Sequence, residues 1–329
     1  MEKELSHVTW LRKKNIHWKA WLSSTTRGDQ ILWGGMVTLT LLPVINLFYI
    51  LATTGANNLS NDYAFFIPLI DDILSGGYDW GHFFQDTFFV SHFQPLPILV
   101  YLVNAWLSGW NIYYELIFIV FLTVIRVVLT YQVLTILYPS RLRALLLPVI
   151  SMLVFGVSQI SSFEFGASAV PLGLTAFGFT LAVWGLVKHN GGWKGFIYII
   201  MGGLIASWTA ATGVIAWPIY LVLMILLGQN KIKHLITWLA CAMVINFPYL
   251  YFLVINRKPG INAYLQSFIN PRLIANLLGR PFANGIGGTT EYIPTGEAAG
   301  WIGLGLGVIG IGLVFARWKT LRLRTAPAT

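Results

Sequence analysis

The stretch IYYELIFIVFLTVIRVVLTYQVLTIL (residues 112–137) decides the fold class of this chain. It contains only two charged side chains, Glu115 and Arg126. A run of about 20 apolar residues is long enough to cross a hydrocarbon core of about 30 Å. In lipid such a segment must be helical, because every backbone N–H and C=O group needs a partner within the segment. The stretch therefore predicts a transmembrane helix.

The composition of the whole chain agrees with this interpretation. Hydrophobic residues make up 56% and charged residues only 10% of the 329 residues, and the mean hydropathy is +0.69. A soluble domain carries about 25% charged residues. Further apolar segments occur at 31–51, 95–109, 142–159, 168–187, 195–212, 213–228, 235–255 and 300–316. We therefore expect an all-α polytopic membrane bundle with about eight spans (eight or nine).

The basic residues indicate how the chain is oriented. The formal net charge is +9, but the basic side chains form short clusters between apolar runs, which is typical of cytoplasmic loops and not of a nucleic-acid interface. The clusters lie at 1–27, 141–143, 188–194, 231–233 and 317–324, and no Lys or Arg occurs between Arg27 and Arg126.

All of these clusters can be cytoplasmic only if one apolar segment between the first two clusters does not span. Segment 95–109 is the shorter candidate and has two prolines near its start, so we expect a juxtamembrane or re-entrant helix there. In the alternative, all nine segments span, and either the Arg141 loop or the C-terminal basic cluster lies outside.

This topology divides the chain into three parts. Residues 1–30 form a basic cytoplasmic arm, 31–316 a transmembrane domain, and 317–329 a basic cytoplasmic tail. Within the transmembrane domain, the two large extracytoplasmic loops are 52–111 and 256–298.

Acidic residues are concentrated in the first outer loop. Of 12 acidic residues in the chain, five lie there: Asp62, Asp71, Asp72, Asp79 and Asp86. An apolar stripe with helical spacing runs through Phe66, Leu69, Ile70, Ile73 and Leu74. We expect an amphipathic helix on the outer leaflet, regular from about Pro68 and ended by the glycine pair at 76–77. Asp71 and Asp72 would face water, and Asp62 would lie at the lipid–water boundary just after the first span.

The order of these pieces resembles a known family. The first span, an outer Asp, FFIPLIDDILSGGYDWGHFF (65–84) and SHFQPLPILVYLVNAWLSGW (91–110) are similar to the first extracytoplasmic loop of GT-C membrane glycosyltransferases. That group includes protein O-mannosyltransferases, the lipid-A aminoarabinose transferase and rhizobial lipopolysaccharide galacturonosyltransferases; uncharacterised bacterial members are the most similar. The segments at 161–174 and 207–223 also resemble outer turns of the group.

The resemblance implies a function. It implies an inverting sugar transfer from a polyprenyl-phosphate-linked donor to an extracytoplasmic glycan, lipid or protein acceptor, in a bacterial plasma membrane with both termini cytoplasmic. Asp62 would be the general base. The implied partners are the sugar donor and membrane lipids, with no nucleic acid and no cofactor; a divalent metal is not predicted. Two departures from the family pattern are Asn61 in place of a second acid, and the sequence Ser-His-Phe-Gln (91–94) where Glu-His-Arg is common.

Other residues complete the predicted site. Arg272 and Arg280, eight residues apart in the second outer loop, would share a helix face and could grip the lipid phosphate bidentately. They could instead be interfacial arginines whose guanidinium groups extend into the aqueous phase. His92, Gln94 and Glu164 are candidate substrate-binding residues, although Glu164 could also be an ordinary loop carboxylate.

Arg126 calls for a separate hypothesis, because a charge within a membrane span is costly. It could line a cavity, or it could pair with Glu115, about three helical turns earlier. We favour a structural or cavity-lining role.

Two other functions fit part of the sequence. A transporter or flippase for lipid-linked glycans predicts internal repeats and discontinuous helices at mid-membrane, whereas the polar residues here gather at one face. An O-antigen polymerase or ligase would use the outer-loop arginines and would not need an acidic first loop.

Overall fold

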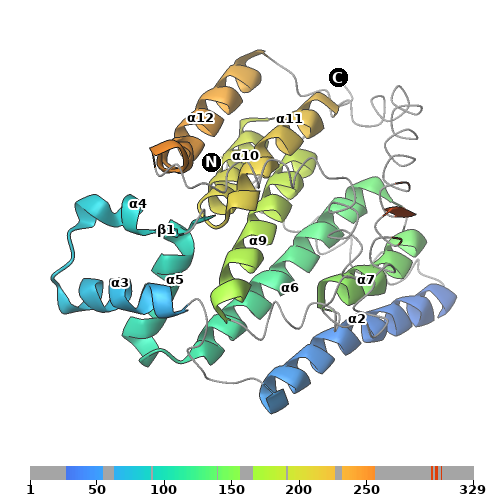
Figure 1. Cartoon of the computed structure of the whole chain (residues 1–329). Coiled ribbons are helices and arrows are strands. Elements are labelled where there is room, and N and C mark those ends of the chain that lie inside the picture. Colours follow the sequence, from blue (N-terminus) through green and yellow to red (C-terminus); the bar gives the residue numbers. More distant parts are fainter. Residues whose placement is uncertain are drawn as a thin grey trace, which may run out of the picture.

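The computed structural model describes residues 27–54, 63–89, 92–138, 140–155, 166–189, 192–226 and 232–255, together with 298, 301, 302 and 305. The described part is almost entirely helical (Figure 1). The exception is one antiparallel pair of two-residue strands, β1 (Phe88–Phe89) and β2 (His92–Phe93). The predicted all-α fold class is confirmed.

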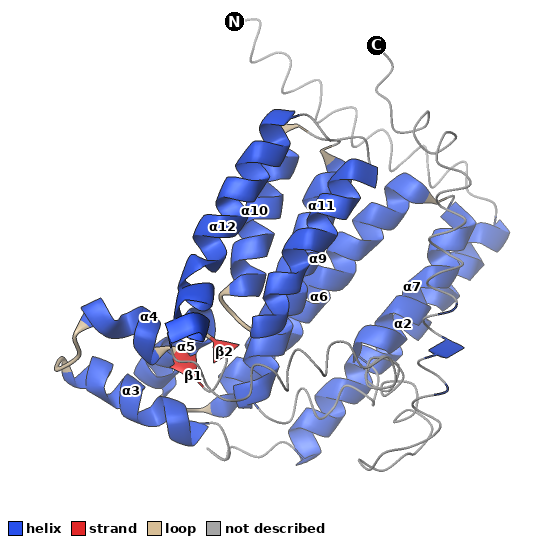
Figure 2. Cartoon of the chain, turned by 45° about the horizontal axis from the view of Figure 1, so that its top comes forward, coloured by secondary structure: helices blue, strands red, loops and turns tan. Residues whose placement is uncertain are grey.

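Seven helices form the main bundle, in which they lie side by side along one general direction (Figure 2). They are α2 (Arg27–Thr54), α6 (Ile112–Leu137), α7 (Ser140–Phe155), α9 (Gly166–Lys188), α10 (Trp193–Ser207), α11 (Ala216–Leu226) and α12 (Ile232–Ile255). The closest neighbours are α9 with α10, α6 with α9, and α2 with α7. The remaining elements are α3 (Tyr63–Ser75), η1 (Trp80–His82), α4 (Phe83–Asp86), α5 (Pro95–Ser108) and η3 (Ala211–Ile215).

Four helices in the described part are long and apolar enough to cross a membrane. They cover Arg27–Thr53, Ile112–Ile136, Ala169–Lys188 and Ile232–Phe252. Shorter apolar helices cover Pro95–Ser108, Trp193–Ser207 and Thr212–Ile225. The chain is thus a helical membrane protein by length and composition, and the total of about eight spans stays a prediction. The expected last span at 300–316 lies largely outside the described residues.

Basic residues of the predicted cytoplasmic clusters lie at one end of the bundle. Arg141 Nε at the start of α7 lies 3.0 Å from Asp29 Oδ1 at the start of α2. Lys188 Nζ at the end of α9 donates to Gln132 Oε1, near the end of α6, at 3.1 Å. Four helix ends that were predicted to be cytoplasmic, those of α2, α6, α7 and α9, therefore lie at one end of the bundle.

The elements of the first predicted outer loop lie at the opposite end (Figure 2). Phe84 of α4 makes an edge contact with Trp208, just after α10, with ring centroids 5.4 Å apart. The ring centroids of Phe88, in β1, and Phe252, near the end of α12, are 5.9 Å apart. Residues 63–89 and 92–110 thus form a helical cap over the helix ends, and the predicted helices within loop 52–111 are confirmed.

Glycine allows the closest helix approach in the bundle. A Cβ added to Gly202 of α10 would lie 2.3 Å from the carbonyl oxygen of Gly178 in α9. A Cβ on Gly213 in η3 would lie 1.8 Å from the carbonyl oxygen of Ala206. Small residues let membrane helices pack backbone to backbone, and here they join α9 to α10 and fold the chain tightly after α10.

Helix α3 corrects two details of the sequence prediction. It begins at Tyr63 and not near Pro68, which lies inside the helix. Its apolar side does not face the outer leaflet: Phe66 stacks on Tyr101 of α5 with ring centroids 5.3 Å apart. Contact with α5 offsets the cost of an interior proline, which removes one backbone donor. Asp71 and Asp72 are exposed, as predicted, and Gly76 follows the helix at φ +80°.

Two other segment boundaries also shift. The first span was expected to begin at residue 31, but α2 already begins at Arg27, inside the predicted basic arm. Segment 95–109 forms α5 as a helix of 14 residues, or about 21 Å, which is short of a bilayer core. Its length agrees with the juxtamembrane or re-entrant interpretation.

Candidate functional site

A buried glutamate joins three elements at the capped end of the bundle. Glu115 lies in the first turn of α6 and is 1% exposed. Its Oε2 accepts a hydrogen bond of 2.5 Å from the Tyr63 hydroxyl of α3. Its Oε1 accepts one of 2.6 Å from Asn104 Nδ2 of α5. Each carboxyl oxygen of Glu115 thus has one hydrogen-bond donor, and the two donors come from different helices.

The turn between α5 and α6 brings Asn104 and Glu115 together. Gly109 ends α5 in the left-handed region, with φ +62°, and Trp110 follows with φ +69°. Asn111 then caps α6, because its side chain accepts from the Tyr113 backbone N–H at 3.1 Å. The chain therefore reverses within three residues, and the first turn of α6 faces the last turns of α5.

Ser108 extends the polar network. Its Oγ lies 2.6 Å from Asn104 Oδ1 and donates to it, and it accepts from the Asn111 backbone N–H at 3.0 Å. The Asn104 amide is thereby oriented: its oxygen faces Ser108 and its nitrogen faces Glu115. The turn and the carboxylate site stabilise each other.

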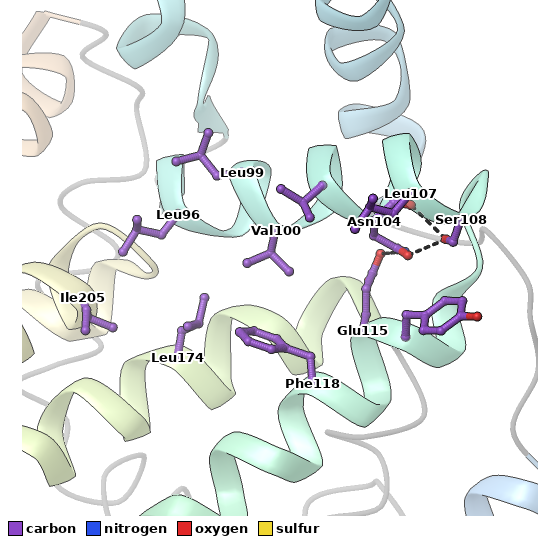
Figure 3. A pocket seen from close by; sticks show the side chains of 12 residues that line it. Leu96, Leu99, Val100, Asn104, Leu107, Ser108, Glu115, Phe118, Leu174 and Ile205 are labelled. Atoms are coloured by element: carbon purple, nitrogen blue, oxygen red, sulfur yellow. Dashed lines mark hydrogen bonds between the residues drawn. The ribbon is translucent and has the colours of Figure 1, made fainter.

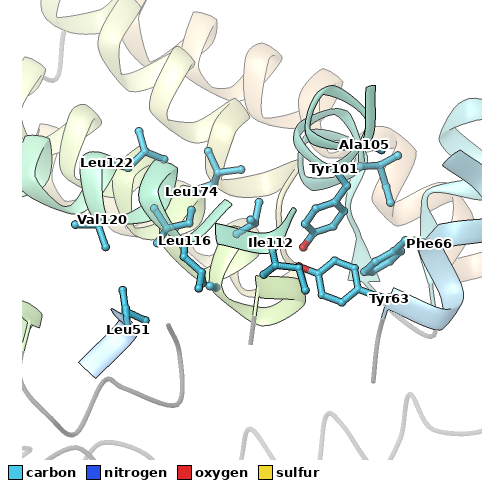
Figure 4. Packing of buried hydrophobic residues seen from close by; sticks show 14 of the residues in the cluster. Leu51, Tyr63, Phe66, Tyr101, Ala105, Ile112, Leu116, Val120, Leu122 and Leu174 are labelled. Carbon is cyan, nitrogen blue, oxygen red and sulfur yellow. The ribbon is translucent and has the colours of Figure 1, made fainter. Parts of the chain in front are cut away.

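Tyr63 is held as a hydrogen-bond donor. Its side chain is buried, and burial, together with the neighbouring Glu115, raises the pKa of the Tyr63 phenol well above its usual range. Its ring makes edge contacts with Tyr101 and Trp110, at centroid distances of 5.6 and 6.2 Å. The apolar cluster around these rings includes Phe66, Ala105, Ile112 and Leu116 (Figure 4).

A cavity of about 710 Å³ adjoins the network. It lies between α5, α6, α9 and α10 (Figure 3). Its apolar lining residues are Leu96, Leu99, Val100, Val103, Leu107, Phe118, Leu174 and Ile205, and its polar residues are Asn104, Ser108, Tyr114 and Glu115. Ligand pockets in proteins typically measure about 300–1,000 Å³. The cavity is therefore large enough for a ligand that is mainly apolar and has one polar end.

The cavity reaches the surface along α5. Val103 and Leu107 line it and are 52% and 68% exposed. The opening along α5 is thus lined by apolar side chains.

Most of the residues predicted for the site lie outside the described part of the chain. These are Asp62, Glu164, Arg272 and Arg280. His92 lies in β2 opposite Phe89. Gln94 directly precedes α5, and its backbone N–H donates to the Thr87 carbonyl at 2.9 Å. The Gln94 side-chain oxygen is buried and finds no hydrogen-bond donor among the described residues.

The alternative in which Arg126 pairs with Glu115 is wrong. Glu115 bonds to Tyr63 and Asn104 instead. Eleven residues of helix separate the two charges by about 16 Å along the axis, which is too far for direct contact. Within the described ranges, Arg126 has a buried Nε with no hydrogen-bond partner.

Three residues of this site were not identified from the sequence: Tyr63, Asn104 and Ser108. Asn104 and Ser108 do carry a signal, since they are polar residues in an otherwise apolar helix, one turn apart on the same face. The partnership of Tyr63 with Glu115 connects positions 52 apart, and no local spacing predicts it.

No cluster of three or more His, Cys, Asp or Glu side chains that could hold a metal ion is found in the described part of the chain. Comparisons of the chain with family models, with curated proteins and with solved structures gave no match.

Proposed function

We propose that this protein is a membrane glycosyltransferase of the GT-C type, which transfers a sugar from a polyprenyl-phosphate donor to an acceptor on the extracytoplasmic face of a bacterial plasma membrane. One observation supports the proposal most directly. The residue that follows Asp62, Tyr63, is fixed through Glu115 beside an apolar cavity with a polar end. Asp62, the candidate base, is the neighbour of this anchor in the sequence.

Asp62 would act as the general base on the acceptor hydroxyl. A carboxylate within hydrogen-bond reach of that hydroxyl can take its proton as the sugar is transferred, and such catalysis contributes about 10²- to 10⁴-fold. In the proposed site Arg272 and Arg280 hold the departing phosphate. His92, Gln94 and Glu164 bind the sugar or the acceptor.

The arrangement of charges supports the proposed orientation. Arg141 and Lys188 lie at one end of the bundle, and the exposed Asp71 and Asp72 belong to the cap at the other. Basic residues favour the cytoplasmic side. The cap would then be extracytoplasmic, where polyprenyl-phosphate sugars are consumed in the family that the chain resembles.

The test is sugar transfer by the purified full-length chain in proteoliposomes made from bacterial lipid extract, which supplies acceptors. A panel of radiolabelled polyprenyl-phosphate monosaccharides is added, and both the free polyprenyl phosphate and the labelled acceptor are measured. Consumption of one donor, with the label recovered on an acceptor, supports the proposal. Movement of donor across the bilayer without chemical change would support a flippase and contradict it.

A further inference from the structure

The polar end of the cavity has unused hydrogen-bonding capacity on Glu115. The two oxygens of a carboxyl group carry about four lone-pair sites. Two of these sites are taken, by Tyr63 and by Asn104. Glu115 can therefore accept further hydrogen bonds from a ligand in the cavity.

Asn104 offers the complementary group. A side-chain amide has two N–H donors, and one of them is directed to Glu115 Oε1. Its oxygen lies 2.6 Å from the Ser108 hydroxyl, which also lies 2.8 Å from the Asn104 backbone carbonyl oxygen. The cavity end can thus accept at Glu115 and donate at Asn104. A hydroxyl group both donates and accepts, so it satisfies both members of this pair. An ammonium group can donate to Glu115 but leaves the Asn104 N–H without an acceptor.

The charge of a phosphate head makes it a poor fit to this end of the cavity. Glu115 is 1% exposed, and the described cavity lining contains no Lys, Arg or His. A phosphate placed there would be a charge in a medium of low dielectric constant, beside an acidic side chain and without a cation to neutralise it. The polar end therefore disfavours a phosphate head.

We propose that this cavity binds a lipid with a hydroxyl head, and not the phosphate end of the sugar donor. The hydroxyl would lie between Glu115 and Asn104, and the chain would lie along Val103, Leu99 and Leu96 of α5. The identification of this lipid as the glycosyl acceptor rests on the proposed function. The selectivity of the cavity for a hydroxyl head does not depend on that function.

The experiment uses three photoreactive probes with the same diazirine-bearing C16 chain: the alcohol, the amine and the phosphate monoester. The full-length chain is labelled in nanodiscs of zwitterionic lipid, and labelled peptides are mapped by mass spectrometry. We expect the alcohol to label peptides from α5 and the start of α6, at least tenfold more than the phosphate ester and more than the amine. Equal labelling by alcohol and phosphate, or labelling that maps elsewhere, would overturn the proposal.

Two variants locate the site. Val103→Trp places a large ring in the cavity and should lower alcohol labelling at least tenfold. Val128→Trp is the matched control, because Val128 is a similarly exposed valine on α6 that does not line the cavity; it should label like wild type. Unchanged labelling of Val103→Trp would overturn the proposal even if variants of Glu115 fail to fold.

Glu115→Gln tests the head-group selectivity. It replaces the acidic group by a neutral amide at nearly constant size, so the preference for alcohol over phosphate should fall. A preference that stays at the wild-type ratio in the folded variant would contradict the role of Glu115.

Labelling and sugar transfer can fail separately. Alcohol labelling without any sugar transfer would refute the acceptor assignment and the proposed function, and it would support the lipid site. Sugar transfer without alcohol labelling would refute the lipid site alone.

Discussion

The hydroxyl of Tyr63 donates a 2.5 Å hydrogen bond to Oε2 of Glu115, which lies 52 residues later in the chain. Both side chains are buried. The bond joins the first residue of α3 to the first turn of a membrane-crossing helix, so it fixes the position at which the chain leaves the cap toward Asp62.

Replacing Tyr63 with Phe should therefore lower the stability of the protein. The change removes one donor and leaves a buried carboxylate oxygen unsatisfied, which costs about 1–3 kcal/mol. Thermal unfolding in detergent measures the effect. Tyr49→Phe is the matched control, because Tyr49 is 66% exposed and its loss should change stability little. Equal melting temperatures for the two variants would contradict the importance of the Tyr63–Glu115 bond.

A double-mutant cycle should show that Tyr63 and Glu115 are coupled. Residues that share a hydrogen bond typically interact by about 0.5–3 kcal/mol. We expect the destabilisation of Tyr63→Phe combined with Glu115→Ala to be smaller than the sum of the two single effects. The same cycle between Tyr63→Phe and Thr237→Val, on the exposed face of α12, should be additive. Additivity in both cycles would contradict the contact.

Close packing of α9 on α10 predicts a large effect of one methyl group. Gly202→Ala would place Cβ 2.3 Å from the Gly178 carbonyl oxygen, so the two helices must separate. Overpacking of this kind costs about 1–3 kcal/mol. Gly34→Ala in α2 meets no atom within 4 Å and should be neutral or stabilising by up to about 1 kcal/mol. The prediction fails if both variants melt at the wild-type temperature.

Alkaline pH should destabilise the wild type more than Tyr63→Phe. The pKa of Tyr63 is raised in the folded protein by burial and by Glu115, whereas in the unfolded chain a tyrosine titrates near pH 10. A raised folded-state pKa contributes stability that is fully present below about pH 10 and declines as the pH rises toward that pKa. Melting temperatures between pH 8 and 11 should fall more steeply for wild type. Parallel curves would show that Tyr63 does not contribute. Tyr78, whose pKa is also raised, is present in both proteins and cancels.

The sequence predicted the helical class and the course of the main helices because long apolar runs have only one stable form in lipid. The spacing of Phe66 and Ile70 correctly predicted an amphipathic helix, and the exposure of Asp71 and Asp72 followed from it. The start of its regular part was placed too late, near Pro68, because a rule about proline was applied without knowing that α5 covers the helix.

The centre of the candidate site could not be predicted in the same way. Glu115 was noticed only as a possible partner for Arg126, since helical spacing reveals neighbours on one helix and not contacts between helices. Its true partners come from α3 and α5, brought close by the reversal at Gly109 and Trp110. The roles of Asp62, Glu164, Arg272 and Arg280 stay predictions, as these residues lie outside the described part of the chain.

Sugar transfer by Asp62→Asn, compared with Asp71→Asn and Asp72→Asn, tests the central proposal most directly. All three changes remove one acidic charge from the same loop, so only a specific role separates them. Release of polyprenyl phosphate in the proteoliposome assay should fall at least 100-fold for Asp62→Asn, in line with the loss of a general base, and should stay near wild type for the other two. Undiminished transfer by a folded Asp62→Asn protein would contradict the account.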